Sequence, residues 1–205
     1  ESNCTCFFPA LILLTGGFIA RREYTDDTLK NILTVPVSLR RLLLGKMTVL
    51  LFLTIFFSIL SGLLGIFLCL AAGLPDLTLP FIAEWMGRIV LGNVLLFAAL
   101  LPLTIVSAFF VNAVYVCTAA GFVSGFLATL EGSPMNYYPV KAALILFDPQ
   151  CGAGYDFVRY SKEGACLSLL AVFLISIVLF LFLRPSGMEA SMKKASAKAA
   201  RRKGW

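Results

Sequence analysis

Long uncharged stretches alternate with short charged ones along this chain. Residues 47–70 and 165–183 contain no charged side chain. An apolar run of about 18 or more residues is long enough to cross a bilayer as a helix. Predicted spans cover residues 4–20, 43–70, 89–111, 113–130 and 165–183, with a tight hairpin at Asn112. The pattern therefore predicts an all-α integral membrane protein, a polytopic helical bundle in which residues 1–205 form a single transmembrane domain.

Composition agrees with this prediction and excludes several kinds of chemistry. Of the 205 residues, 60% are hydrophobic and 14% are charged, whereas soluble domains average about 45–50% and about 25%. The chain has no histidine, so Ser-His-Asp and Cys-His relays and imidazole zinc sites are excluded. Gly45-Lys46 lacks the rest of a phosphate-binding loop. We therefore expect no enzyme activity and no catalytic, cofactor or metal site. The sequence is compatible with a disulfide bond between Cys151 and Cys166 and equally with two free thiols.

The basic residues are distributed unevenly between the segments that join the spans. Of the 17 Lys and Arg residues, thirteen lie in residues 21–46 and 184–205, and four lie in residues 73–88 and 131–164. Cytoplasmic segments carry the excess of Lys and Arg. We therefore expect a multi-pass protein of the cell membrane with residues 21–46 and the C-terminal tail in the cytoplasm. This bias accounts for the net charge of +6 without a nucleic-acid partner, and the tail is expected to contact anionic lipid.

Residues 23–38 have the pattern of a short amphipathic helix between the first two spans. Thr25 or Asp26 can cap it, Leu29, Ile32 and Leu33 share one face, and Pro36 ends it. An isolated helix shorter than about 12–15 residues is marginal in water, so this one is expected to dock. Its apolar face could lie in the membrane interface or in a groove of a cytoplasmic protein, and the residues alone leave both open.

This segment resembles the signature of ABC-2 type transporter permeases, which has an acidic residue, a T-x-K-N-L stretch, P-x-S and a terminal G-K. Many members carry a glycine directly before the threonine, and this chain has Asp27 at that position. Permeases of the lantibiotic-immunity and bacitracin-resistance kind often lack that glycine as well. The resemblance implies a coupling helix that is seated on an ATPase subunit. The residues that it assigns to this contact are Glu23, Thr28, Leu29, Lys30, Ile32, Leu33 and Pro36; Asn31, Val37, Ser38, Gly45 and Lys46 complete the match.

The resemblance also implies the assembly and the number of spans. Two permease copies, identical or related, would sit on two ABC ATPase subunits, which would bind ATP and magnesium. The cargo would be an amphipathic peptide such as a lantibiotic or a bacitracin-like compound, exported for self-protection. The family has six spans, and this chain starts with Glu1 directly before an apolar run. We therefore expect that the native chain begins earlier and contains a sixth span.

Several residues inside the spans and loops are candidates for packing or binding. Gly121 and Gly125 belong to a stripe of small residues, which predicts close helix packing within the chain or a dimer interface. Asn93 is the clearest strongly polar side chain inside the third span. Val140–Phe147 is too short to span and is expected to be an extracytoplasmic re-entrant or interfacial helix. An aromatic belt on the outer side is expected from Trp85, Tyr137, Tyr138, Tyr155 and Tyr160.

Two other functions are compatible with these patterns. The chain could be a non-transporting anchor or sensor subunit that recruits a cytoplasmic partner through the same short helix. It could also be a secondary carrier. A proton- or ion-driven carrier is expected to have charged residues near the middle of the bilayer, and the predicted spans lack such a cluster. Export by an ATP-driven transporter is therefore the leading hypothesis.

Overall fold

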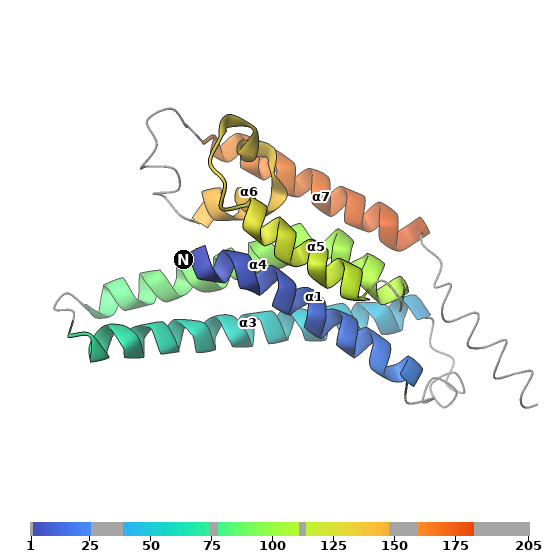
Figure 1. Ribbon diagram of the computed structural model, residues 1–205, viewed down its shortest axis with the longest axis horizontal. Helices are drawn as coiled ribbons and strands as arrows, with labels where there is room; N and C mark the ends of the chain where they lie inside the picture. The colour runs from blue at the N-terminus through green and yellow to red at the C-terminus, as the bar shows by residue number, and fades with distance from the viewer. Residues whose placement is uncertain (1, 26–38, 74–77, 111–113, 148–159, 183–205) are drawn as a thin grey trace, which may run out of the picture.

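The computed structural model describes residues 2–25, 39–73, 78–110, 114–147 and 160–182 (Figure 1). These residues form helices and turns, and no strand occurs among them. The predicted all-α polytopic bundle is confirmed. The helices are α1 (Ser2–Thr25), α3 (Leu39–Ala71), α4 (Leu79–Phe109), α5 (Val114–Leu127), the short 3-10 helix η2 (Ser133–Tyr137), α6 (Pro139–Phe147) and α7 (Lys162–Phe182).

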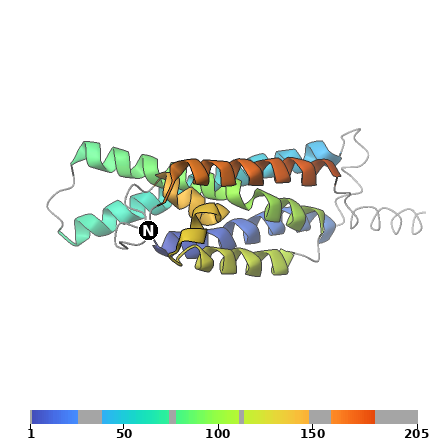
Figure 2. The same cartoon turned by 90° about the horizontal axis from the view of Figure 1, so that it is seen from above.

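The central helix of the bundle is α4, which contacts α1, α3, α5, α6 and α7. Helix α5 lies alongside α1, and α6 lies against α7. In both Figure 1 and Figure 2, the hairpin made by the end of α3 and the start of α4 projects beyond the N-terminus of α1. The bundle therefore consists of a long α3–α4 hairpin beside shorter helices.

Three of the described helices are long and apolar enough to cross a membrane. They are Arg41–Ala71, Leu79–Ala108 and Lys162–Phe182, and two shorter apolar helices cover Phe7–Ile19 and Val114–Leu127. Helix α5 has 14 residues, which correspond to about 21 Å at 1.5 Å per residue. All five predicted spans coincide with helices, but the first and fourth are shorter in their apolar part than the others.

Helix α4 begins ten residues before the predicted start at Ile89. Thr78 precedes its first turn, and a proline lies within that turn, where its missing N–H costs nothing. Glu84 and Arg88 form an ion pair one turn apart on the exposed surface. The helix therefore begins before the predicted span, because these charges end the apolar run and not the helix.

Helix α1 also continues beyond its predicted end at Arg21-Arg22. It reaches Thr25 and therefore includes Glu23, which the sequence pattern assigned to the following segment. Arg and Glu have high helix propensity, so the chain leaves the apolar span without leaving the helix. Similarly, α3 begins at Leu39 rather than at residue 43.

The main core lies where α1, α3 and α4 meet. Ile12 and Leu13 of α1, Leu50 of α3, and Leu96 and Leu100 of α4 are all buried there. In contrast, the outer faces of the helices expose large apolar side chains such as Phe52 and Phe67 of α3. Such faces are expected when the surrounding solvent is lipid hydrocarbon rather than water.

The ends of three helices lie together at one end of the bundle. The last residue of α1, the first residue of α3 and the last residue of α7 are all at this end (Figure 1). These are the helix ends that border residues 26–38 and 183–205, which the charge distribution predicts to be cytoplasmic. The geometry agrees with the predicted parity of the spans, and the assignment of this end to the cytoplasm stays a prediction.

The predicted short helix at Val140–Phe147 is present as α6, which has nine residues. It contacts α4 and α7, and Val140, Ala142 and Ala143 are buried. Helix α6 is thus part of the packed bundle, at the end opposite to that of the α1 C-terminus (Figure 1). Its depth in the bilayer stays a prediction.

Candidate functional site

The predicted coupling segment lies almost entirely outside the described residues. Glu23 belongs to α1. The contact of this segment with an ATPase subunit therefore stays a prediction. The assigned residues outside the described ranges are Thr28, Leu29, Lys30, Ile32, Leu33 and Pro36.

Gly121 and Gly125 are both buried on α5. A methyl group at Gly121 would collide with Cδ1 of Leu13 and would lie 3.2 Å from the carbonyl oxygen of Pro9. Gly121 therefore lets α5 approach α1 of the same chain closely. Packing within the chain accounts for Gly121, and a dimer interface on this helix stays a prediction.

A cavity of about 320 Å³ lies between α3, α4 and α6. Its lining comes from residues 61–68 of α3, residues 85–96 of α4 and residues 143–147 of α6. This volume is at the lower end of the range of about 300–1,000 Å³ that is typical of small-molecule sites. Two of the lining residues, Leu64 and Leu68, are 56% and 65% exposed. The α3 side of the cavity is therefore formed in part by exposed apolar side chains.

Two aromatic rings lie against glycines in the cavity wall. The indole of Trp85 lies over Gly65 of α3, and the ring of Phe147 lies over Gly92 of α4. A methyl group at either glycine would come to 2.5 Å from the ring. The two glycines therefore provide the room for flat side chains from α4 and α6, and the cavity remains between them.

Asn93 is the strongly polar side chain in this apolar lining. It is 7% exposed, and its amide has no hydrogen-bond partner among the residues that the structure describes. Buried hydroxyl groups elsewhere in the spans are satisfied within their own helix: Thr54 and Ser58 donate to carbonyl oxygens at 2.8 and 2.6 Å. A buried polar group without a partner is unfavourable, so Asn93 is a candidate ligand-binding residue.

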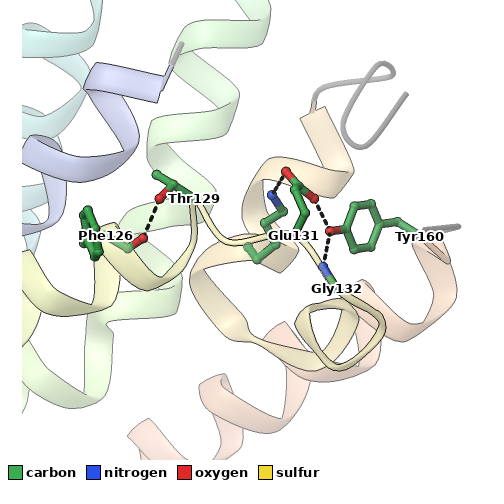
Figure 3. A network of polar contacts seen from close by, with 6 residues as sticks. Phe126, Thr129, Glu131, Gly132 and Tyr160 are labelled. Carbon is green, nitrogen blue, oxygen red and sulfur yellow. Dashed lines mark hydrogen bonds and ion pairs between the residues drawn. The ribbon is translucent and has the colours of Figure 1, made fainter. Parts of the chain in front are cut away.

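A second polar site lies between the end of α5 and the start of α7 (Figure 3). The Nζ atom of Lys141 on α6 donates to Oε1 of Glu131 at 2.7 Å, and the side chain of Lys141 is 3% exposed. The Tyr160 hydroxyl donates to the other oxygen of Glu131. In addition, Lys141 Nζ lies 5.5 Å from the centre of the Tyr160 ring. The buried ammonium is thus compensated by a carboxylate and an aromatic face.

Further hydrogen bonds hold the η2–α6 segment in place. Tyr138 donates to the carbonyl oxygen of Ser124 on α5 at 2.9 Å, and Ser168 of α7 donates to the carbonyl oxygen of Tyr137 at 2.8 Å. Tyr138 lies between η2 and α6, and burial raises the pKa of its phenol. The hydroxyl therefore remains a donor at neutral pH. These contacts connect the α6 wall of the cavity to α5 and α7.

The sequence patterns indicated Asn93 but neither the cavity nor the ion pair. Lys141 is the charged residue in an apolar stretch of eight residues, 140–147, and such a charge in a membrane protein usually has a partner. This signal could have indicated that a carboxylate lies nearby, but the choice of Glu131 depends on the fold. Trp85 lines the cavity and Tyr160 donates to Glu131, and their assignment to an aromatic belt stays a prediction. Cys166 has a free thiol, and Cys151 lies outside the described residues.

Comparison with known proteins identifies the family. A family model described as "ABC-2 family transporter protein" matches residues 1–128. The bacitracin transport permease protein BCRB of Bacillus licheniformis is 24% identical over 162 residues, which cover 78% of this chain and 76% of that protein. No solved structure matches the chain. Because the family match covers more than half of the 205 residues, this multi-pass membrane protein belongs to the ABC-2 family of transporter proteins.

Proposed function

We propose that this transporter permease subunit exports an antimicrobial peptide, or a similar amphipathic compound, by using ATP that a separate ABC ATPase subunit hydrolyses. The observation that carries the proposal is the similarity to a bacitracin transport permease over 78% of the chain. The absence of a phosphate-binding loop from the sequence supports the view that ATP and magnesium bind to the partner.

The arrangement of the helices suggests how a partner could act on this chain. The proposed coupling segment, residues 23–38, begins in the last turn of α1 and leads to the start of α3, so force applied to it acts on both helices. Both helices contact α4, and α3 and α4 carry most of the cavity lining. Movement of the coupling segment would therefore change the separation of helices around the cavity.

The coupling role can be tested with matched charge substitutions. Leu29→Asp with Leu33→Asp places two carboxylates on the predicted apolar face. Thr34→Asp, at a residue outside the matched signature, adds a carboxylate on the opposite face at 100° per residue and serves as the control. The first variant is expected to lose co-purification with the ATPase subunit, whereas the control is expected to retain it. Equal co-purification of both variants would overturn the coupling assignment.

Export can be tested in cells that express the ATPase partner with each form of the permease. The intact chain and the control are expected to protect cells against bacitracin or a related peptide, and the Leu29→Asp/Leu33→Asp variant is expected to lose this protection. Equal sensitivity of cells with and without the permease, for every membrane-active peptide tested, would remove the export proposal and favour a non-transporting subunit.

A further inference from the structure

The cavity between α3, α4 and α6 differs from the rest of the bundle because it contains an unsatisfied amide. Asn93 is more than nine-tenths buried, lines an otherwise largely apolar space and finds no hydrogen-bond partner in the described part of the chain. Its carboxamide can both donate and accept hydrogen bonds. A ligand that satisfies it would offer a donor and an acceptor next to an apolar group.

The position of Asn93 along α4 indicates its depth. Glu84 and Arg88 form an exposed ion pair, which marks the level at which α4 leaves the hydrocarbon. Asn93 is five residues further along, about 7.5 Å deeper at 1.5 Å per residue. The amide therefore lies deeper than this ion pair, and the exposed Leu64 and Leu68 of α3 line the cavity nearer to the level of Trp85.

Neither water nor an ordinary lipid tail matches this site well. A buried water usually makes about three hydrogen bonds, and few polar groups line the cavity. An alkyl chain would fill the volume but would leave the amide of Asn93 unsatisfied. The ester of a glycerolipid accepts hydrogen bonds but cannot donate one, whereas a peptide bond does both.

We propose that this cavity binds an apolar side chain of the peptide cargo, with the adjacent peptide bond hydrogen-bonded to Asn93. The ligand enters sideways from the membrane, between the exposed leucines of α3 and the α6 wall. Phe147 and Trp85 bound the space that the apolar side chain occupies. The assignment of the ligand to the cargo rests on the proposed export function, whereas the preference for an amide rests on the cavity alone.

The test uses Trp85 as a reporter of occupancy. The sequence has two tryptophans, so Trp205→Phe leaves Trp85 as the single one, and bromine atoms quench indole fluorescence on contact. The probes are N-(8-bromooctyl)acetamide and 8-bromooctyl acetate, which differ only in an amide N–H or an ester oxygen. Both are titrated into nanodiscs that contain the full chain, and quenching is compared at equal membrane concentration.

The amide probe is expected to bind roughly fivefold more tightly than the ester, a ratio typical of one net hydrogen bond. In Asn93→Leu this preference is expected to disappear, with both probes at the level of the ester. Ala143→Leu, which fills the cavity from α6, is expected to reduce quenching by both probes. Equal quenching by the two probes in the intact protein would overturn the proposal and indicate a site for lipid chains.

The result separates this inference from the proposed function. Loss of the amide preference in Asn93→Leu, together with loss of peptide resistance in cells, supports a cargo site. An amide preference in a protein that confers no resistance to any peptide would contradict export while leaving the cavity chemistry intact. Resistance that is unchanged in Asn93→Leu and in Ala143→Leu would show that cargo does not use this cavity, and would overturn the cargo assignment alone.

Discussion

The α1–α5 contact and the α3–α4–α6 region both pack side chains against glycines, but the two regions differ in the kind of side chain and in the space that is left. At Gly17 and Gly121, aliphatic side chains of the facing helix fill the space completely, and a methyl group would collide with them. At Gly65 and Gly92, the neighbours are flat aromatic rings, and a cavity of about 320 Å³ remains beside them. The first region is packed like a protein interior, whereas the second keeps room for a ligand.

The polar groups of the two regions differ in the same sense. In the α1–α5 region, the hydroxyls of Thr15 and Thr118 donate to carbonyl oxygens of their own helices, so they require nothing from a ligand. In the α3–α4–α6 region, Lys141 is compensated by Glu131, and Asn93 is left without a partner in the described residues. In the α3–α4–α6 region, the Lys141–Glu131 ion pair therefore holds the α6 wall of the cavity in place, and the Asn93 amide inside the cavity remains available for a ligand.

Removal of one partner of the ion pair is expected to have the largest effect. Lys141→Met leaves the Glu131 carboxylate without its cation and is expected to destabilise the protein by about 3 kcal/mol. The control, Lys141→Met with Glu131→Leu, removes both charges and is expected to recover most of this loss. Thermal unfolding in nanodiscs measures both. If the double variant is as unstable as the single one, the pair does not act as an isolated charge-compensated unit.

A larger side chain in the tightly packed region is expected to have the next largest effect. Gly121→Val would collide with Leu13 and approach Pro9 of α1, with an expected cost of about 1–3 kcal/mol. Gly87→Val is the matched control, because nothing lies within 4 Å of a methyl group at Gly87 on α4. The same unfolding measurement compares them, and equal stability of the two variants would argue against close α1–α5 packing.

Two neighbouring alanines of α6 sharpen the comparison further. Ala142 packs with Ile145 and Ala165 against α7, whereas Ala143 lines the cavity. Ala142→Leu is therefore expected to cost about 1–3 kcal/mol, and Ala143→Leu less than about 1 kcal/mol because the cavity accommodates the added atoms. A greater loss of stability for Ala143→Leu than for Ala142→Leu would show that the cavity is not available space.

The smallest expected change in stability belongs to Asn93→Leu. Replacing an unsatisfied buried amide with an apolar group of similar size is expected to leave stability unchanged or to raise it by up to about 1 kcal/mol. Thr104→Val provides a contrast, because the Thr104 hydroxyl donates to the Leu101 carbonyl at 2.8 Å. A marked loss of stability in Asn93→Leu alone would indicate that the amide has a structural partner.

Hydropathy predicted the helices well but not all of their ends. The five predicted spans are helices in the structure, since a run of apolar residues in a membrane has few alternatives to a helix. Helix α4 begins ten residues before its predicted span, and α1 continues past the end of its predicted span to include Glu23. Charged residues such as Glu84 and Arg88 mark where a helix leaves hydrocarbon, and they do not mark where its hydrogen bonds stop.

The candidate site was predictable only in part, for a physical reason. Asn93 is conspicuous because a strongly polar residue in a span is rare, and α6 was expected because its apolar stretch is too short to span. The cavity depends on how the rings of Trp85 and Phe147 lie against glycines of other helices, and the Lys141–Glu131 contact depends on the path between α5 and α6. Neither long-range arrangement follows from a local pattern.

ATP-driven movement of peptide by the reconstituted transporter is the measurement that tests the central claim most directly. The full chain and its ATPase partner are placed in vesicles with a fluorescent antimicrobial peptide bound to the membrane. We predict that ATP, but not a non-hydrolysable analogue, lowers the amount of bound peptide, and that Leu29→Asp with Leu33→Asp abolishes this decrease. An unchanged amount of bound peptide with ATP and active ATPase subunits would contradict the account.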